Sequence, residues 1–175
     1  MTTEWNARFL NTERFAAMAG HASYQTPLTD LARVLAACPE SDRSSTLPVC
    51  DWSVHAETRG SDSRQTAWMH LQASLNLPQI CQRCLEPMNV PLEVDRWFRF
   101  VADEATALAQ DDGCEEDLLV TSGEFNGLEL LEDELLMALP LIVSHGDCQP
   151  PASSALLDDL PHPFAALAGL KTTGS

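Results

Sequence analysis

The chain has 175 residues, a length that fits one domain, and 45% of them are apolar, which is enough for a hydrophobic core and excludes a disordered chain. Its 26 acidic residues outnumber its 10 basic residues, so the formal net charge at pH 7 is −16. This charge opposes nucleic-acid binding over most of the surface, because phosphate contacts depend on Lys and Arg, and it attracts basic partners.

The sequence contains no membrane or export signal. No segment reaches the ~18 consecutive apolar residues that a membrane helix needs. The N-terminus, Met1 to Arg8, lacks the basic start and apolar run of a signal peptide. We therefore expect a cytoplasmic protein without membrane contact, in which the six cysteines are reduced and free for metal binding, redox chemistry or burial.

The N-terminal part of the chain, to about Arg43, is predicted to hold a short lead-in and one helix. Apolar residues recur there at helical spacing, at Leu28, Leu31, Leu35 and Cys38. Thr29 or Asp30 is the expected cap of this helix, and Pro39 is expected to end it. A polar connector over 41–46 follows.

Alternation of apolar and polar residues between Leu47 and Ala102 predicts β-strands. The longest run has apolar residues at every second position: Ala67, Met69, Leu71, Ala73, Leu75 and Leu77. A second alternating run covers 90–100, and a weaker one covers 54–58, ahead of a turn at 60–63. The sequence therefore predicts an antiparallel sheet from about Val49 to Val101.

The connection between the two longer strands carries a C-x-x-C motif at Cys81 and Cys84. Two thiols at this spacing can share a metal ion or a disulfide. Tetrahedral zinc needs four sulfur or nitrogen ligands, and His145 and Cys148 would complete a Cys₃His set. The alternative is that the two thiols pack or lie exposed and His145 is an ordinary loop histidine. The remaining cysteines have no partner at ligand spacing: Cys38, Cys50 and Cys114.

Thioredoxin-like redox chemistry is the other interpretation of the C-x-x-C motif. Redox thiols normally lie at a helix N-terminus within a βαβ unit, which lowers their pKa. Strands are predicted on both sides of Cys81 and Cys84 instead, which favours a structural role. The five histidines are scattered, and the sequence has neither a Gly-x-Ser-x-Gly motif nor a phosphate-binding loop, so we predict no catalytic residue.

The stretch past Ala102 is acidic, and no Lys or Arg occurs between Phe100 and Leu170. We predict a mobile loop over 111–117, where like charges repel, and a short strand over 118–121 that extends the sheet. The acidic surface either keeps the protein soluble or holds a basic partner such as a ribosomal protein.

A second helix has clear start and stop signals. Asn126 is its expected cap, with Glu129 three residues later, and Pro140 ends it. Its inward stripe is Leu128, Leu131, Leu135 and Leu139. The predicted fold is therefore α+β: an antiparallel sheet, with a barrel-like form as one option, and two packed helices. We place a single domain at 1–148 and predict that the Pro-rich tail, 149–175, is poorly ordered.

One patch combines arginine and aromatic residues: Arg83, Arg96, Arg99, Trp97, Phe98 and Phe100. Aromatic side chains beside arginines can stack RNA bases on a sheet face. Phe98 and Phe100 fall on the apolar side of their strand, however, which favours burial, and Glu93 and Asp95 dilute the charge. Direct RNA contact is only weakly indicated.

Two segments in combination carry a resemblance to a known family: Cys81-Gln-Arg-Cys84-Leu85 with Pro87, and Leu130-Leu-Glu-Asp-Glu-Leu-Leu-Met-Ala-Leu-Pro-Leu141 followed by His145 and Cys148. With the acidic run before Leu118, they make the chain resemble the YceD family, the bacterial large-ribosomal-RNA-subunit accumulation proteins. The resemblance implies a cytoplasmic, non-enzymatic factor that supports synthesis, processing or stability of 23S ribosomal RNA.

The charge of the chain favours a basic ribosomal protein or assembly factor as the direct partner over RNA itself. Two alternatives from other functional classes stay open at this point. One is a small thiol redox protein that uses Cys81 and Cys84. The other is a zinc-bearing regulator of transcription.

Overall fold

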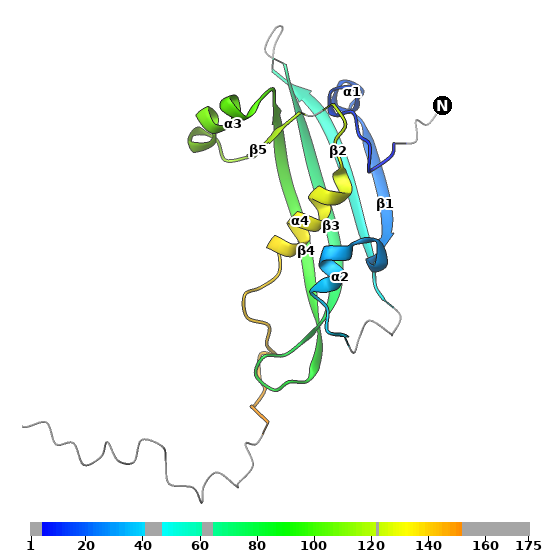
Figure 1. Cartoon of the computed structure of the whole chain (residues 1–175), viewed down its shortest axis with the longest axis vertical. Coiled ribbons are helices and arrows are strands. Elements are labelled where there is room, and N and C mark those ends of the chain that lie inside the picture. Colours follow the sequence, from blue (N-terminus) through cyan, green and yellow to red (C-terminus); the bar gives the residue numbers. More distant parts are fainter. Residues whose placement is uncertain (1–4, 41–46, 61–64, 122, 152–175) are drawn as a thin grey trace, which may run out of the picture.

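A five-stranded sheet forms the body of the molecule (Figure 1). The computed structural model describes residues 5–40, 47–60, 65–121 and 123–151, so the predicted connector at 41–46, most of the turn at 60–63 and most of the tail lie outside the described residues. The strands are β1 (His21–Pro27), β2 (Val49–Arg59), β3 (Thr66–Ile80), β4 (Pro87–Val101) and β5 (Asp117–Val120).

The sheet is open and mostly antiparallel. Strands β1 to β4 pair in chain order as an antiparallel meander, and β5 pairs parallel to β4. A barrel would require β1 and β5 to pair with each other, and they occupy opposite edges. The predicted α+β class is confirmed, and the predicted antiparallel pairing is confirmed for β1 to β4, whereas β5 is parallel and the barrel-like option is wrong.

The alternating sequence of β3 and β4 determines which face of the sheet is buried. Met69, Leu71 and Leu77 on β3 lie in the core, and so do Phe98 and Phe100 on β4. The polar residues between them face the other way, as expected for strands with a period of two. The two long strands pair from Trp68↔Arg99 to Ile80↔Pro87, so they form one extended hairpin that ends at the C-x-x-C motif.

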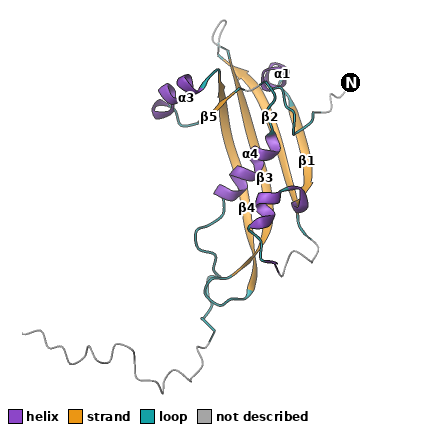
Figure 2. Cartoon of the chain, in the orientation of Figure 1, coloured by secondary structure: helices purple, strands orange, loops and turns teal. Residues whose placement is uncertain are grey.

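Four α-helices accompany the sheet in the described part of the chain, rather than the two predicted. They are α1 (Thr12–Ala17), α2 (Ala32–Ala36), α3 (Glu104–Gln110) and α4 (Gly127–Met137), with 3₁₀ turns η1 (Leu28–Asp30) before α2 and η4 (Asp111–Gly113) after α3. Helices α2 and α4 lie across one face of the strands, and α3 stands beside β5 at the margin (Figure 2). None of these helices is long and apolar enough to cross a bilayer, within the ranges described above.

The predicted N-terminal helix and acidic loop differ from the structure in detail. The predicted helix is η1 followed by the short α2, and the predicted lead-in contains both α1 and β1. The predicted loop over 111–117 holds η4 and the first residue of β5, and the predicted strand over 118–121 is β5 at Asp117–Val120.

Helix α2 is capped by another helix rather than by its own sequence. Neither Thr29 nor Asp30 caps it, because its N-cap position is Leu31, which makes no side-chain cap. Instead, Glu132 of α4 accepts the backbone N–H of Arg33 at 2.7 Å. The Arg33 guanidinium also donates to Asp133 and to the carbonyl of Glu129, so α2 and α4 are joined through one arginine.

Helix α4 begins where the sequence predicts. The side chain of Asn126 accepts the N–H groups of Leu128 at 3.1 Å and of Glu129 at 3.4 Å. The helix ends at Met137, shortly before Pro140, and its buried stripe includes Leu131 and Leu135. Leu139, the last residue of the predicted stripe, lies beyond the helix and is half-buried.

Replacing this cap provides a test of the helix start. Asn126→Ala removes the acceptor of both N–H groups, so we expect the free energy of unfolding to fall by about 1 kcal/mol in urea denaturation. Asn126→Asp keeps an acceptor and places negative charge at the helix N-terminus, and its stability should match the wild type. Equal stability of the alanine and aspartate variants would show that the cap contributes nothing.

Candidate metal centre

The C-x-x-C motif forms a closed turn between β3 and β4. The N–H of Cys81 donates to the carbonyl of Glu86 at 2.9 Å, and the N–H of Leu85 donates to the carbonyl of Cys81 at 2.9 Å. Leu85 has φ +65°, the left-handed conformation that lets the chain reverse after the second cysteine. The hairpin connection predicted for this motif is confirmed, and both thiols lie on a hydrogen-bonded turn.

The segment after α4 packs against this turn. The N–H of Gln82 donates to the carbonyl of Val143 at 2.8 Å, and Val143 itself is buried. The guanidinium of Arg83 donates to the carbonyl of Cys148 at 3.4 Å. Two parts of the chain that are far apart in sequence are thereby joined at one end of the sheet.

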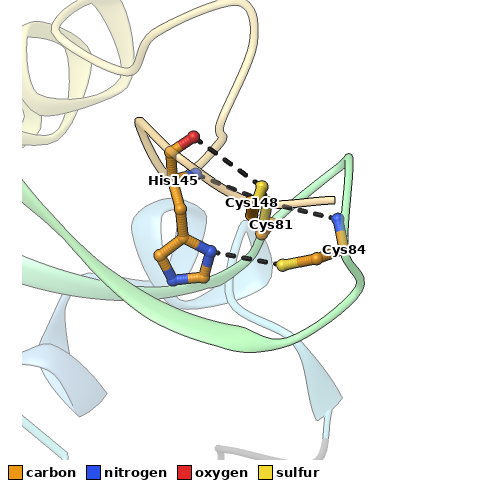
Figure 3. A group of neighbouring side chains, drawn as sticks. All are labelled: Cys81, Cys84, His145 and Cys148. Carbon is orange, nitrogen blue, oxygen red and sulfur yellow. Dashed lines mark hydrogen bonds between the residues drawn. The ribbon is translucent and has the colours of Figure 1, made fainter. Parts of the chain in front are cut away.

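All four predicted ligands meet at this junction (Figure 3). The Sγ atoms of Cys81 and Cys148 are 3.6 Å apart, and Cys84 Sγ lies 3.3 Å from His145 Nδ1. The four donor atoms lie within 4.8 Å of one another, and none of the cysteines is in a disulfide. The structure brings together every residue of the predicted Cys₃His set.

Two of the donor separations are close to those of tetrahedral zinc coordination. With Zn–S near 2.3 Å and Zn–N near 2.05 Å, tetrahedral angles place two sulfurs about 3.8 Å apart and a sulfur and a nitrogen about 3.6 Å apart. The observed 3.6 and 3.3 Å are close to these values. The four donor atoms lie within 4.8 Å of one another, so the group could hold a metal ion once its wider-spaced donors draw closer.

The environment of Cys81 favours the thiolate, the form that binds metals. Burial by itself would raise the pKa of this thiol. Three backbone N–H groups point at its sulfur, from Arg83 at 3.4 Å, Cys84 at 3.5 Å and His145 at 3.4 Å, and they hold the pKa at about 5. Burial and the adjacent sulfurs of Cys81 and Cys84 raise the pKa of Cys148.

The number of ligands indicates what the cluster can do chemically. Catalytic zinc sites keep one position for water or substrate, whereas structural sites are closed by four protein ligands. Cys81, Cys84, His145 and Cys148 supply all four. A metal bound here would connect the hairpin to the segment after α4.

Comparison with known protein families identifies the family of this chain. The family model described as "Large ribosomal RNA subunit accumulation protein YceD" matches residues 69–171, more than half of the chain. The chain belongs to the YceD family. The matched region of this YceD-family chain begins on β3 and includes all four residues of the cluster.

A curated relative agrees with this assignment. The chain is 32% identical over 122 residues to the Large ribosomal RNA subunit accumulation protein YceD of Haemophilus influenzae, and the alignment covers 63% of this chain and 68% of the relative. No solved structure matches.

The other three cysteines lie apart from the cluster. Cys38 and Cys50 are buried, and burial, with the nearby charge of Asp51, raises the pKa of Cys50 to about 12. Cys114 follows η4, where its thiol donates to the backbone carbonyls of Asp111 and Glu116. None of them joins the group of potential ligands found among the described residues.

The predicted arginine–aromatic patch does not form one surface. Phe98 and Phe100 are core residues, and Arg83 lies at the hairpin turn. Arg96 pairs with Asp117, and Arg99 donates to Glu116 at 2.6 Å. The charge of both strand arginines is therefore neutralised within the molecule.

Trp97, the remaining aromatic of that patch, is in contact with His70 and Arg59. His70 stacks on its ring at 4.4 Å with parallel planes, and the Arg59 guanidinium lies 4.2 Å from the ring centroid. Arg59 also lies over Trp68 at 4.3 Å, so these side chains form a packed cluster on the outer face of the sheet. Our sequence analysis missed this cluster.

Much of the acidic run is also paired inside the molecule. Glu132 and Asp133 bind Arg33, and Glu116 and Asp117 bind the strand arginines. Glu134 is buried, which raises its pKa, and Arg96 opposes the shift. By contrast, three carboxylates around η4 are exposed and form no ion pair among the described residues: Asp111, Asp112 and Glu115.

Proposed function

We propose that this protein is a non-enzymatic assembly factor that supports accumulation of the large-subunit ribosomal RNA, the 23S species, in the cytoplasm. The observation that carries the proposal is the family match over 69–171. The relative from Haemophilus influenzae carries the same description. A Cys₃His group with four protein donors, which offers no open coordination position, supports a role without catalysis at this site.

We further propose that the direct partner is a basic ribosomal protein or assembly factor. A net charge of −16 repels phosphates and speeds the encounter with cationic proteins. The pairing of Arg96 and Arg99 with carboxylates, and the contacts that Trp97 makes with His70 and Arg59, support this route over base stacking. The exposed carboxylates of Asp111, Asp112 and Glu115 are the groups that we expect a basic partner to contact.

The cluster at the hairpin turn is proposed to hold one structural zinc ion. Its donor types, the two short separations and the N–H groups directed at Cys81 Sγ support zinc. The ion would stabilise the junction between the hairpin and the segment after α4. Stoichiometric zinc on all three sulfurs would also leave no free dithiol at Cys81 and Cys84, which excludes the redox alternative.

Deletion of the gene tests the functional proposal. We expect precursor 23S RNA to accumulate and mature 23S to fall relative to 16S RNA, measured by Northern blot or RNA sequencing. Expression of the wild-type protein from a plasmid should restore the ratio. An unchanged ratio of 23S to 16S RNA after deletion would contradict the proposal.

The partner proposal has a charge-matched test. We expect Asp111→Asn, Asp112→Asn and Glu115→Gln together to reduce capture of basic ribosomal proteins from nuclease-treated lysate. The control removes the same charge from exposed acids elsewhere: Glu13→Gln, Glu86→Gln and Glu93→Gln. Capture should also weaken as salt rises, because exposed charges are screened. Binding of deproteinised 23S RNA by the purified protein would contradict the proposal.

A further inference from the structure

Strand β1 is an edge of the sheet that lacks most of the usual protection against pairing. No strand in the described ranges pairs with its outer side, and Figure 1 shows it at the margin opposite β5. Exposed edge strands normally carry charged side chains, Lys above all, or proline, which discourage pairing with another chain. The sequence of β1, His-Ala-Ser-Tyr-Gln-Thr-Pro, contains no Lys, Arg, Asp or Glu, and only its last residue, Pro27, is of a protecting type.

The hydrogen-bonding pattern of β1 determines which backbone groups face the open edge. The N–H of Ala56 donates to the carbonyl of Gly20 at 2.8 Å, and this pair continues the register of β1 with β2. Bonded and non-bonded pairs alternate in an antiparallel ladder, so the even-numbered residues of β1 bond to β2. The odd-numbered residues direct their N–H and C=O groups outward: His21, Ser23 and Gln25. No other described segment forms a backbone hydrogen bond with these groups.

A depression of about 620 Å³, which we call the outer hollow, begins at β1 and extends to β4 on the face of the sheet opposite α4. Its lining includes the carboxylates of Asp51, Glu93 and Asp95, and no Lys, Arg or His among the described residues. Asp51 lies on β2, next to β1, and accepts the side-chain N–H of Gln25 at 2.8 Å. A basic side chain that reached over β1 would meet the negative charge of Asp51 first.

A second depression, of about 710 Å³, lies on the other side of β1, between the strand and the N-terminal segment, and we call it the inner hollow. The rings of Trp5, Tyr24 and Trp52 line it, and Arg8 and Asp30 contribute one charge of each sign. Tyr24 donates to the carbonyl of Trp5 at 2.9 Å, and its ring lies 4.6 Å from that of Trp52, so the aromatic wall is fixed. Such a wall suits an apolar side chain.

We propose that β1 accepts an extended segment of a partner protein in which Lys or Arg alternates with apolar residues. The backbone of the segment bonds to Ser23 and Gln25 and adds a strand to the sheet. Side chains of a strand alternate between its two faces, so the basic ones enter the outer hollow toward Asp51 and the apolar ones enter the inner hollow. A second copy of the chain is a poorer occupant, because each copy carries a charge of −16.

This contact goes beyond the partner proposal made above. It lies at the opposite edge of the sheet from η4, and it requires neither the ribosomal role nor the carboxylates around η4. A synthetic peptide that alternates Lys and Val and has the seven residues of β1 serves as the probe. Binding of this peptide to the full-length protein, followed by fluorescence anisotropy, is therefore independent of any result on ribosomal RNA.

Two variants of one residue test the backbone pairing. Ser23→Pro removes an N–H that points outward and leaves the bonds to β2 in place, so we expect peptide binding to weaken about tenfold. Ser23→Ala keeps the backbone N–H, and its affinity should match the wild type. Hydrogen exchange on the wild-type protein needs no variant: the peptide should slow exchange of the Ser23 and Gln25 amides about tenfold.

A second pair of variants tests the preference for basic side chains. Asp51→Asn should weaken peptide binding about threefold. Glu93→Gln removes the same charge from the same hollow, but Glu93 lies on β4, three strand spacings or about 14 Å from β1. That separation exceeds the screening length in physiological salt, so its affinity should not change.

Four results would overturn the proposal. The first is no binding at peptide concentrations on the order of millimolar. The second is binding that survives Ser23→Pro, and the third is equal loss in Asp51→Asn and Glu93→Gln. The fourth is slow exchange of the Ser23 amide in the free protein that disappears on dilution, which would identify a second copy of the chain as the occupant.

Discussion

Cys81→Ser is expected to abolish zinc binding and to lower the melting temperature by about 10 °C. Cys81 is the buried ligand of the set, and its sulfur receives three backbone N–H groups. An ion present at a thousand times its dissociation constant stabilises a fold by about 4 kcal/mol. In a chain of this size, each kcal/mol shifts the melting temperature by about 2–4 °C.

Scanning calorimetry of the zinc-loaded protein measures this change. The matched control is Cys114→Ser, which removes a partly exposed thiol outside the cluster and should leave the melting temperature within about 1 °C. Chelator added to the wild type should reproduce the loss seen in the Cys81 variant. A Cys81→Ser protein that melts with the wild type in the presence of zinc would argue against a structural ion.

Glu132→Ala is expected to lower the free energy of unfolding by about 2–3 kcal/mol, because it removes a charge-assisted hydrogen bond that caps another helix. The Glu132 side chain is 11% exposed, and its carboxylate holds both the backbone N–H and the guanidinium of Arg33. The variant should therefore weaken the contact between α2 and α4. Urea denaturation of the purified proteins gives the value.

The neighbouring acid provides the comparison. Asp133 pairs with the same arginine, but its side chain is 54% exposed. We therefore expect Asp133→Ala to lower the free energy of unfolding by only about 0.5 kcal/mol. Equal losses for the two alanine variants would show that burial and the backbone cap do not distinguish them.

The parts of the fold that could be predicted are those with long periodic patterns. Strands β3 and β4 have fifteen residues each, and buried residues alternate with more exposed ones over most of their length. This alternation identifies the buried face of each strand from its own sequence. Helix α4 combines an Asn cap with an apolar stripe. The clustering of Cys81, Cys84, His145 and Cys148 could be predicted because these four residues supply one chemically complete Cys₃His set.

The elements that sequence reasoning missed are short or lack a buried stripe. Helix α3 has no buried residue, and α1 spans six residues, too few for a periodic signal. Strand β1 is an edge strand whose residues are mostly half-buried or exposed, so its alternation is weak.

Contacts between residues that are far apart in the sequence explain the remaining differences between the predicted and the observed structure. The cap of α2 comes from Glu132, far along the chain, where a local reading considers only Thr29 and Asp30. The packing of Arg59 between Trp68 and Trp97 depends on the strand register, which places residues from three strands side by side. Neither contact has a local sequence signal.

Native mass spectrometry of the purified protein tests the zinc assignment most directly. We expect one zinc ion per chain, lost on treatment with a strong chelator, lost in Cys84→Ser and retained in Cys114→Ser. A protein purified without chelator from zinc-supplemented cells that carries no metal would contradict the assignment. Zinc retained at one ion per chain in the Cys84 variant would contradict it as well.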